Sequence, residues 1–267
     1  MTNGKRIASN VRVLRRLRKG LSIATGSALL LLFGASFAMR TGDISVTPEA
    51  RAIVDSPDRS EDDRETDVRR HPAQMLTFFE VQPGMNVLDI GTGRGYTTEL
   101  LARAVGPYGS VVAQNDSTIS ERFLKGATPS RFSKDVMKNV TYVVLPYDDP
   151  VPPGTSNLDL ITVIFVYHDM EWLGIDRAAA NRSFFRALKP GGHVVVVDHA
   201  GNPGTGVSES KTTHRIEESV VHQEFAAAGF QLVDVATFLR NPDDPRTESF
   251  RQATIPSDRF VLKFRKP

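Results

Sequence analysis

The chain of 267 residues contains no cysteine. Disulfide bonds, thiolate nucleophiles and cysteine-ligated metal centres are therefore excluded, while the cellular compartment stays open. Acidic residues are absent from the first 40 positions, which hold eight of the 33 lysines and arginines. The other 227 residues carry 25 basic and 31 acidic side chains. The body of the chain is thus mildly acidic, which argues against nucleic acid as a partner.

Charge is also absent from residues 21–39, which follow the basic residues 1–20. Ser36 and Ala38 place small side chains where a signal peptidase would cut after Ala38. We expect residues 1–38 to be a signal peptide. An uncleaved membrane anchor is the alternative, because the apolar run reaches the lower limit for spanning a bilayer. Either form predicts an exported protein that is periplasmic or held at the inner membrane only through this segment.

Residues 39–70 are short of apolar side chains and rich in charge. They predict a polar tether followed by an exposed lead-in helix, in which the charges of residues 61–70 face solvent. Residues 75–79 are apolar and predict a helix packed on a sheet. The folded domain is therefore expected to span residues 71–267.

A nicotinamide-binding fingerprint, G-x-G-x-x-G, is missing as well. The nearest sequence is an apolar strand, residues 87–90, followed by Gly91, Gly93 and Gly95, with Tyr96 where the last glycine would stand. A helical pattern follows at once. Strand, glycine turn and helix form the opening unit of a parallel α/β sheet, in which the helix N-terminus faces a ligand.

An acid, Asp89, lies two residues before the first glycine of this loop. A carboxylate there would repel a pyrophosphate but would suit a cationic amino group. The loop therefore indicates a ligand with an ammonium group, such as S-adenosylmethionine (SAM), rather than a dinucleotide. An ordinary tight turn, with Asp89 as a capping carboxylate, is the simpler alternative.

The rest of the chain alternates between apolar strands and helical segments, as in a doubly wound sheet. The most apolar of these segments, residues 158–166, fits a central strand buried on both faces. Further strands are expected at residues 110–114, 141–145, 193–198, 231–239 and 259–265.

These features resemble the class I SAM-dependent methyltransferases over residues 71–267. The resemblance rests on the loop from Val87 to Gly95, Asn115-Asp116, Leu158-Asp159-Leu160 and the Leu188 to Gly192 turn. Tyr167-His168-Asp169, Asp198-His199 and residues 258–264 resemble a little-characterised bacterial branch of predicted methyltransferases with export leaders.

The resemblance implies SAM as cofactor and an α/β, Rossmann-like, doubly wound sheet of seven mostly parallel strands with an antiparallel last strand. One departure concerns the acid that takes the ribose hydroxyls after the second strand, because Asn115 stands in its place and Asp116 follows. The residues predicted to bind the cofactor are Asp89, Gly91, Thr92, Gly93, Gly95, Asn115, Asp116 and Asp148.

Two histidines follow the strands whose ends flank the acceptor in this family, and each has an acid beside it. We predict that His168 is the general base and that Asp198 and His199 shape the acceptor site. His193, at the other end of its strand, is predicted to be structural. The histidines could instead bind a metal or merely tie strand ends together; we assign no metal.

The sequence thus predicts a SAM-dependent methyltransferase that acts on a small-molecule or lipid-like acceptor. An exported methyltransferase needs SAM outside the cytosol, where it is made. The alternative is therefore an exported protein that binds SAM or a nucleoside-type ligand without turnover. A nicotinamide oxidoreductase is a third possibility, disfavoured by Asp89 and Tyr96.

Overall fold

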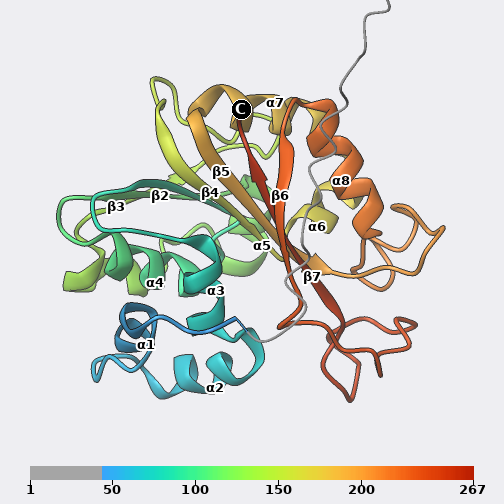
Figure 1. Ribbon diagram of the computed structural model, residues 1–267, viewed down its shortest axis with the longest axis horizontal. Helices are drawn as coiled ribbons and strands as arrows, with labels where there is room; N and C mark the ends of the chain where they lie inside the picture. Colours follow the sequence, from blue (N-terminus) through green and yellow to red (C-terminus); the bar gives the residue numbers. More distant parts are fainter. Residues whose placement is uncertain (1–43) are drawn as a thin grey trace, which may run out of the picture. The chain divides into compact units, whose positions relative to one another are not determined.

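The computed structural model describes residues 44–267, in which seven strands form a single sheet (Figure 1). The strand order is β3-β2-β1-β4-β5-β7-β6. The bounds are β1 Asn86–Ile90, β2 Ser110–Asn115, β3 Val140–Val144, β4 Leu158–Ile164, β5 Leu188–His199, β6 Gln231–Ala236 and β7 Arg259–Arg265.

Strands β1 to β5 run parallel, and β7 lies antiparallel between β5 and β6. The predicted fold class, a doubly wound sheet of seven mostly parallel strands with an antiparallel last strand, is confirmed. The strand order reverses between β1 and β4, because β2 and β3 lie on one side of β1 and the later strands on the other. Ligands bind at such a switch point, outside the carboxyl ends of the strands.

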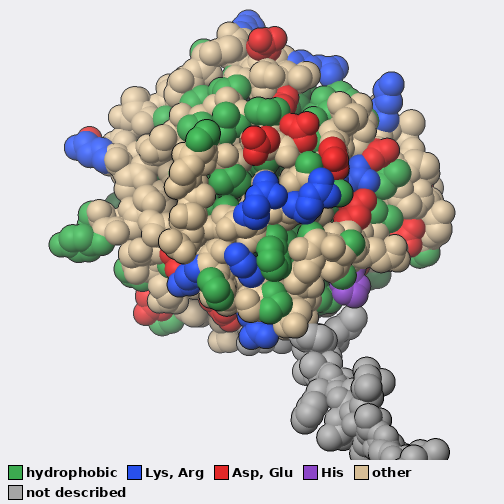
Figure 2. Space-filling model, turned by 90° about the horizontal axis from the view of Figure 1, so that it is seen from above, with side chains coloured by type: hydrophobic (Ala, Val, Ile, Leu, Met, Phe, Trp, Pro, Cys, Tyr) green, Lys and Arg blue, Asp and Glu red, His purple; other side chains and the backbone are tan. Residues whose placement is uncertain are grey.

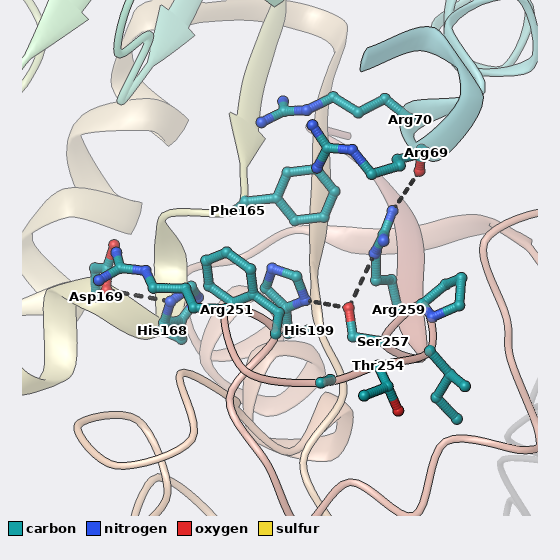
Figure 3. A pocket seen from close by; sticks show the side chains of 14 residues that line it. Arg69, Arg70, Phe165, His168, Asp169, His199, Arg251, Thr254, Ser257 and Arg259 are labelled. Carbon is teal, nitrogen blue, oxygen red and sulfur yellow. Dashed lines mark hydrogen bonds and ion pairs between the residues drawn. The ribbon is translucent and has the colours of Figure 1, made fainter. Parts of the chain in front are cut away.

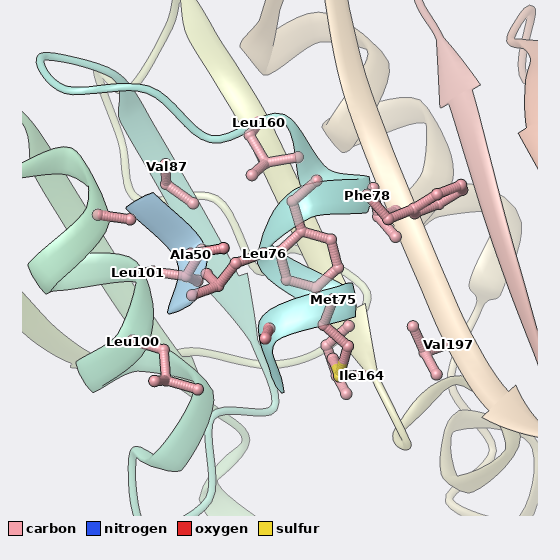
Figure 4. Close-up of a cluster of buried hydrophobic side chains, with 14 of the residues drawn as sticks. Ala50, Met75, Leu76, Phe78, Val87, Leu100, Leu101, Leu160, Ile164 and Val197 are labelled. Carbon is pink, nitrogen blue, oxygen red and sulfur yellow. The ribbon is translucent and has the colours of Figure 1, made fainter. Parts of the chain in front are cut away.

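Both faces of the sheet are buried, as the apolar runs of the central strands predict. In β5, Val195 and Val197 enter one core cluster, whereas Val194 and Val196 enter the other. Successive side chains of a strand point to opposite faces, so an unbroken run of valines requires helices on both sides. Figure 4 shows the first cluster, where Met75, Leu76 and Phe78 pack against the strands.

Helices cover the two faces in separate groups. Side chains of α1, α3 and α4 enter the first cluster, and side chains of α6, α7 and α8 enter the second. The helices are α1 Pro48–Val54, α2 Glu61–Arg70, α3 Pro72–Phe79, α4 Tyr96–Val105, α5 Ser117–Leu124, α6 Tyr167–Trp172, α7 Arg177–Ala187 and α8 Glu218–Ala227, with short 3-10 turns η1 Ser130–Ser133 and η2 Asp135–Met137.

The segment before residue 71 differs from the predicted tether. Thr47 and Ser60 cap α1 and α2 by accepting hydrogen bonds from backbone amides, and Ala50 and Val54 are buried in the first cluster. Capping side chains satisfy amides that would otherwise lack partners, so even short polar helices form here. The folded domain therefore begins before residue 50. The predicted signal segment, residues 1–38, lies outside the described residues.

Helix α2 also differs from the exposed helix that its charge pattern suggested. Asp63 is buried and pairs with Arg131 through two hydrogen bonds of 2.6 and 2.8 Å. Arg131 also contacts Glu99 of α4, which in turn accepts hydrogen bonds from Arg103 and Lys134. A run of polar residues can thus face the interior when its charged partners come from distant parts of the sequence. The local sequence pattern does not reveal such partners.

We expect Glu99→Ala to lower the free energy of unfolding by about 3 kcal/mol, because it removes one partner of a buried ion network and leaves three cations without it. The Glu99 side chain is only 1% exposed. Asp135→Ala is the control, since its ion pair with Lys138 is exposed, and should change stability by less than about 0.5 kcal/mol. Urea unfolding followed by circular dichroism measures both. Equal losses in the two variants would contradict the network's role.

Helix α8 begins only at Glu218, after an extended segment. Ile216 forms an isolated β-bridge with Ala200, which keeps this part of the chain extended. The carboxylate of Glu217 accepts hydrogen bonds from the amides of Gly204 and Gly206, which ties the loop of residues 201–206 to the start of the helix.

None of the helices in residues 44–267 is long and apolar enough to cross a membrane. The face of the molecule in Figure 2 carries lysine and arginine side chains interspersed with aspartate and glutamate. This mixed surface agrees with the mildly acidic composition.

Candidate functional site

The glycine loop between β1 and α4 has the backbone geometry that its sequence predicts. Gly91, Gly93 and Gly95 have φ of +66°, +56° and +83°, a region that L side chains rarely adopt. A Cβ on Gly91 would also lie 2.7 Å from the Val166 side chain. Only glycine fits position 91 on both counts. A Cβ on Gly93, by contrast, would meet no atom within 4 Å.

Side chains at the end of β2 hold this loop through hydrogen bonds to its backbone. The Gly93 amide donates a 2.8 Å hydrogen bond to Asn115 Oδ1, and Asn115 Nδ2 donates to the Gly93 carbonyl at 3.0 Å. The amide of Gly91 donates to Gln114 Oε1 at 3.4 Å. Asn115, predicted to contact the ribose, is thus engaged with the loop, while Asp116 caps α5 by accepting from Thr118 N.

Asp89 lies beneath the loop and is 1% exposed. Thr98 and Thr162 donate hydrogen bonds of 2.5 and 2.7 Å to its two carboxylate oxygens, and the Thr92 hydroxyl is hydrogen-bonded to that of Thr98. Burial raises the pKa of Asp89, and the hydroxyl groups oppose this rise. Thr98 and Thr162 were not among the residues that the sequence pointed to, since a lone threonine carries no motif.

These residues fit a SAM-type ligand. Gly95 precedes α4 without a side-chain cap, so no side chain of the described residues caps the first amides of this helix. In the turn after β3, Tyr147 is fully buried within the second core cluster, whereas Asp148 beside it is exposed. The sequence predicts Asp148 as a cofactor-binding residue, and its side chain is accessible in this turn.

His168 lies at the start of α6, directly after β4, and is 2% exposed. Its Nδ1 is 2.6 Å from Asp198 Oδ1, and its Nε2 is 3.1 Å from Asp169 Oδ1. Burial lowers the pKa of His168, but the two carboxylates outweigh this and raise it to about 10. His168 is therefore an imidazolium at neutral pH, held between Asp198 and Asp169.

His199, at the end of β5, has the opposite character. Its ring stacks on Phe250 at 4.3 Å, and its Nδ1 lies 2.8 Å from Ser257 Oγ. Burial and the neighbouring His168 cation hold the pKa of His199 well below its usual value. Its Nε2 makes no hydrogen bond with the residues described. His199 is thus a neutral imidazole with one nitrogen free, in the pocket that Figure 3 shows.

The raised pKa of His168 makes the stability of the fold depend on pH. A histidine with a folded-state pKa near 10 contributes stability fully below its unfolded pKa of about 6.5, and this contribution is lost as pH rises through 10. We expect the free energy of unfolding to fall by a few kcal/mol between pH 7 and 10 and His168→Gln to lose this slope. Urea titrations at several pH values test this; an identical slope in both proteins would contradict it.

A cavity of about 420 Å³ lies beside these histidines, at the carboxyl edge of the sheet. It is lined by Phe165, His168 and His199 and by residues of α2 and of the loop before β7. Among the lining side chains are four arginines, Arg69, Arg70, Arg251 and Arg259. Sequence analysis missed all four. Arg69 and Arg70 belong to the charge run interpreted as a solvated face, Arg251 belongs to no motif, and Arg259 lies in residues 258–264, to which no binding role was assigned.

One further cluster combines His168, Asp169 and His214, whose ligand atoms lie within 4.8 Å of one another. The cavity next to Asp169 and His214 is also lined by Arg122, Lys211 and Arg251. These cations would repel a metal ion, and the His168 nitrogens already face carboxylates. We therefore keep the assignment without a metal as a prediction.

One protein-family model matches the first part of the described domain. Residues 49–144 match the family model described as protein-L-isoaspartate(D-aspartate) O-methyltransferase. This match starts in α1 and ends with β3, so it includes the glycine loop and Asp89.

Two relatives share the name ubiquinone/menaquinone biosynthesis C-methyltransferase UbiE. The protein from Shewanella frigidimarina is 32% identical over 135 residues, which are 49% of this chain and 47% of the relative. The protein from Ectopseudomonas mendocina is 34% identical over 125 residues, 46% of each chain. The chain thus matches about half the length of these relatives.

Solved structures share the fold at low sequence identity. A SAM-dependent methyltransferase from Aquifex aeolicus has a TM-score of 0.52 and 20% identity, covering 72% of this chain and 87% of its own. The [4+2]-cyclase SpnF has a TM-score of 0.55 and 16% identity, covering 77% and 81%. These similarities concern the fold, which hosts more than one chemistry.

Proposed function

Because this chain carries a class I SAM-dependent methyltransferase domain, we propose that it transfers a methyl group from SAM to a small-molecule or lipid-like acceptor. SAM is the cofactor that the family implies. The observation that carries the proposal is that the glycine loop, with its positive φ angles and the buried Asp89, lies at the same carboxyl edge of the sheet as a cavity lined by a neutral histidine.

The glycine loop and the residues around it would hold the cofactor. The uncapped end of α4 and the space above Gly93 leave room for the methionine part, and Asp89 supplies negative charge near its ammonium. When bound, SAM supplies an electrophilic methyl group on a sulfonium. The chain's own contribution is then to align the acceptor with that methyl group and to remove a proton where the acceptor keeps one.

We assign the proton-accepting role to His199 rather than to His168. His168 is already protonated at neutral pH, so it cannot take up another proton. In the tautomer that donates from Nδ1 to Ser257, the Nε2 lone pair of His199 is free to accept one. When two neighbouring titratable groups have pKa values shifted in opposite directions, one can act as the base and the other as an electrostatic stabiliser. Asp198 holds His168 in place through Nδ1 and through its backbone amide.

Titration calorimetry with SAM, S-adenosylhomocysteine and NAD tests the cofactor assignment. We expect the first two to bind and NAD not to bind. Asp89→Asn should weaken SAM at least tenfold, because it removes the charge that faces the ammonium. A thermal unfolding curve verifies that the variant folds. Equal SAM affinity in folded Asp89→Asn, or tight binding of NAD alone, would contradict the proposal.

We also propose that the domain is exported, periplasmic or anchored through the N-terminal segment alone. The support is the tripartite pattern of residues 1–38. N-terminal sequencing of protein recovered from membrane and periplasmic fractions tests this. An intact Met1 on protein recovered only from the cytosol would contradict it.

A further inference from the structure

The cavity beside His199 concentrates positive charge that the protein itself does not neutralise. Among residues 44–267, no carboxylate lies within ion-pair distance of Arg69, Arg70, Arg251 or Arg259. Elsewhere in the described chain, the arginines with ion pairs include buried ones such as Arg59 and Arg215. The only acid that lines the cavity is Asp169, and it already contacts His168, His214 and Trp172.

Arg259 is the most deeply placed of the four and is 8% exposed. Its Nε donates to Ser257 Oγ at 3.2 Å, and one terminal nitrogen donates to the Arg69 carbonyl at 2.6 Å. The other terminal nitrogen makes no hydrogen bond with the described residues. Burial and the nearby Arg70 and Arg69 lower the pKa of Arg259 to about 10, in keeping with a cation that has no carboxylate within ion-pair distance.

Phe165 lies at the centre of this arrangement (Figure 3). The Arg70 guanidinium carbon lies 4.8 Å from the ring centroid of Phe165, and that of Arg259 lies 5.4 Å from it. Arg70 makes no hydrogen bond to the described residues, so the two aromatic rings of Phe165 and Tyr96 are its main contacts. Aromatic faces hold a cation in position without neutralising it.

From this geometry we infer that the cavity takes an acceptor that carries an oxyanion, a carboxylate or a phosphate, on an apolar body. Guanidinium groups match both oxyanions through paired hydrogen bonds. Phe165 and Phe250 offer apolar surface for the body, and the volume of about 420 Å³ suits a small organic acid. The inference deepens the proposed function, because it names the class of molecule that the methyl group would reach.

The binding of phenylacetate, phenyl phosphate and neutral phenylacetamide, measured by calorimetry at pH 7, tests this inference. We expect each anion to bind at least tenfold more tightly than phenylacetamide, and the better of the two anions identifies the oxyanion. Arg70→Gln should reduce anion affinity at least tenfold. Arg251→Gln, which removes a side chain that contacts only the Phe250 ring among the described residues, serves as a second test.

Arg182→Gln is the matched control, since Arg182 lies on α7 and its side chain is 57% exposed. It should bind all three probes as the unmodified chain does. Equal binding of phenylacetamide and the anions, or unchanged anion affinity in folded Arg70→Gln and Arg251→Gln, would overturn the inference. SAM titrations of the same proteins separate the two proposals: anion binding without SAM binding would refute the methyltransferase function and leave the anion site in place.

Discussion

Alanine at position 199 is expected to slow methyl transfer by a factor of about 10² to 10⁴, the range for removing a general base. His199 is buried and neutral, lines the cavity of about 420 Å³ and has Nε2 without a hydrogen bond to the described residues. Its ring packs on Phe250 and not on the glycine loop that is predicted to hold the cofactor. SAM affinity should therefore change little in His199→Ala, while turnover falls.

His193→Ala is the control, because His193 also lies on β5, six residues before His199, and does not line the cavity. It should keep both turnover and SAM affinity. A pH profile adds a second readout: because the pKa of His199 is lowered, the rate should stay level as the pH falls through the ordinary histidine pKa of about 6.5. Full turnover in folded His199→Ala, or loss of turnover in His168→Gln alone, would return the role of base to His168.

Gly91→Ala is expected to weaken SAM at least a hundredfold. The new Cβ would lie 2.7 Å from a Val166 methyl group, and φ of +66° is strained for alanine. Relief requires the loop to move, and the loop is what positions the open amides of α4. Calorimetry with SAM, together with urea unfolding, measures the effect on binding and on stability.

Gly84→Ala is the control that distinguishes the effect of backbone strain from the effect of displacing the glycine loop. Gly84 has φ of +84°, but its Cβ would meet no atom within 4 Å, and it lies before β1 at the other edge of the sheet. This variant should lose about 1 kcal/mol of stability and keep its SAM affinity. Equal SAM affinities for Gly91→Ala and Gly84→Ala would show that the contact with Val166 does not matter.

The fold could be predicted from the sequence because its evidence is local. The apolar runs of β1, β4 and β5, the glycine loop and the turn of residues 188–192 are each recognised from neighbouring residues, and parallel α/β topology orders the elements. The prediction of a polar tether was wrong for the opposite reason, because the contacts that order this segment are not local. Asp63 of α2 is buried by Arg131, which lies 68 residues away, and no local pattern contains such a pair.

The candidate site could be predicted in position but not in electrostatics. The sequence brings His168, Asp198 and His199 to one edge of the sheet, as the structure shows. Which histidine carries a proton depends on distances: Asp198 lies 2.6 Å from His168 Nδ1, whereas His199 faces Ser257. The arginines of the cavity come from α2, from the loop before β7 and from the start of β7, and only the folded chain brings them together.

Transfer of labelled methyl groups tests the central claim most directly. The chain is incubated with SAM that carries a radioactive methyl group and with a small-molecule extract of the source cells, alongside His199→Ala. We predict that label enters an acidic small molecule with the unmodified chain and is reduced at least a hundredfold with the variant. SAM that binds but passes no label to any molecule of the extract would contradict the proposed transfer and favour a ligand-binding protein without turnover.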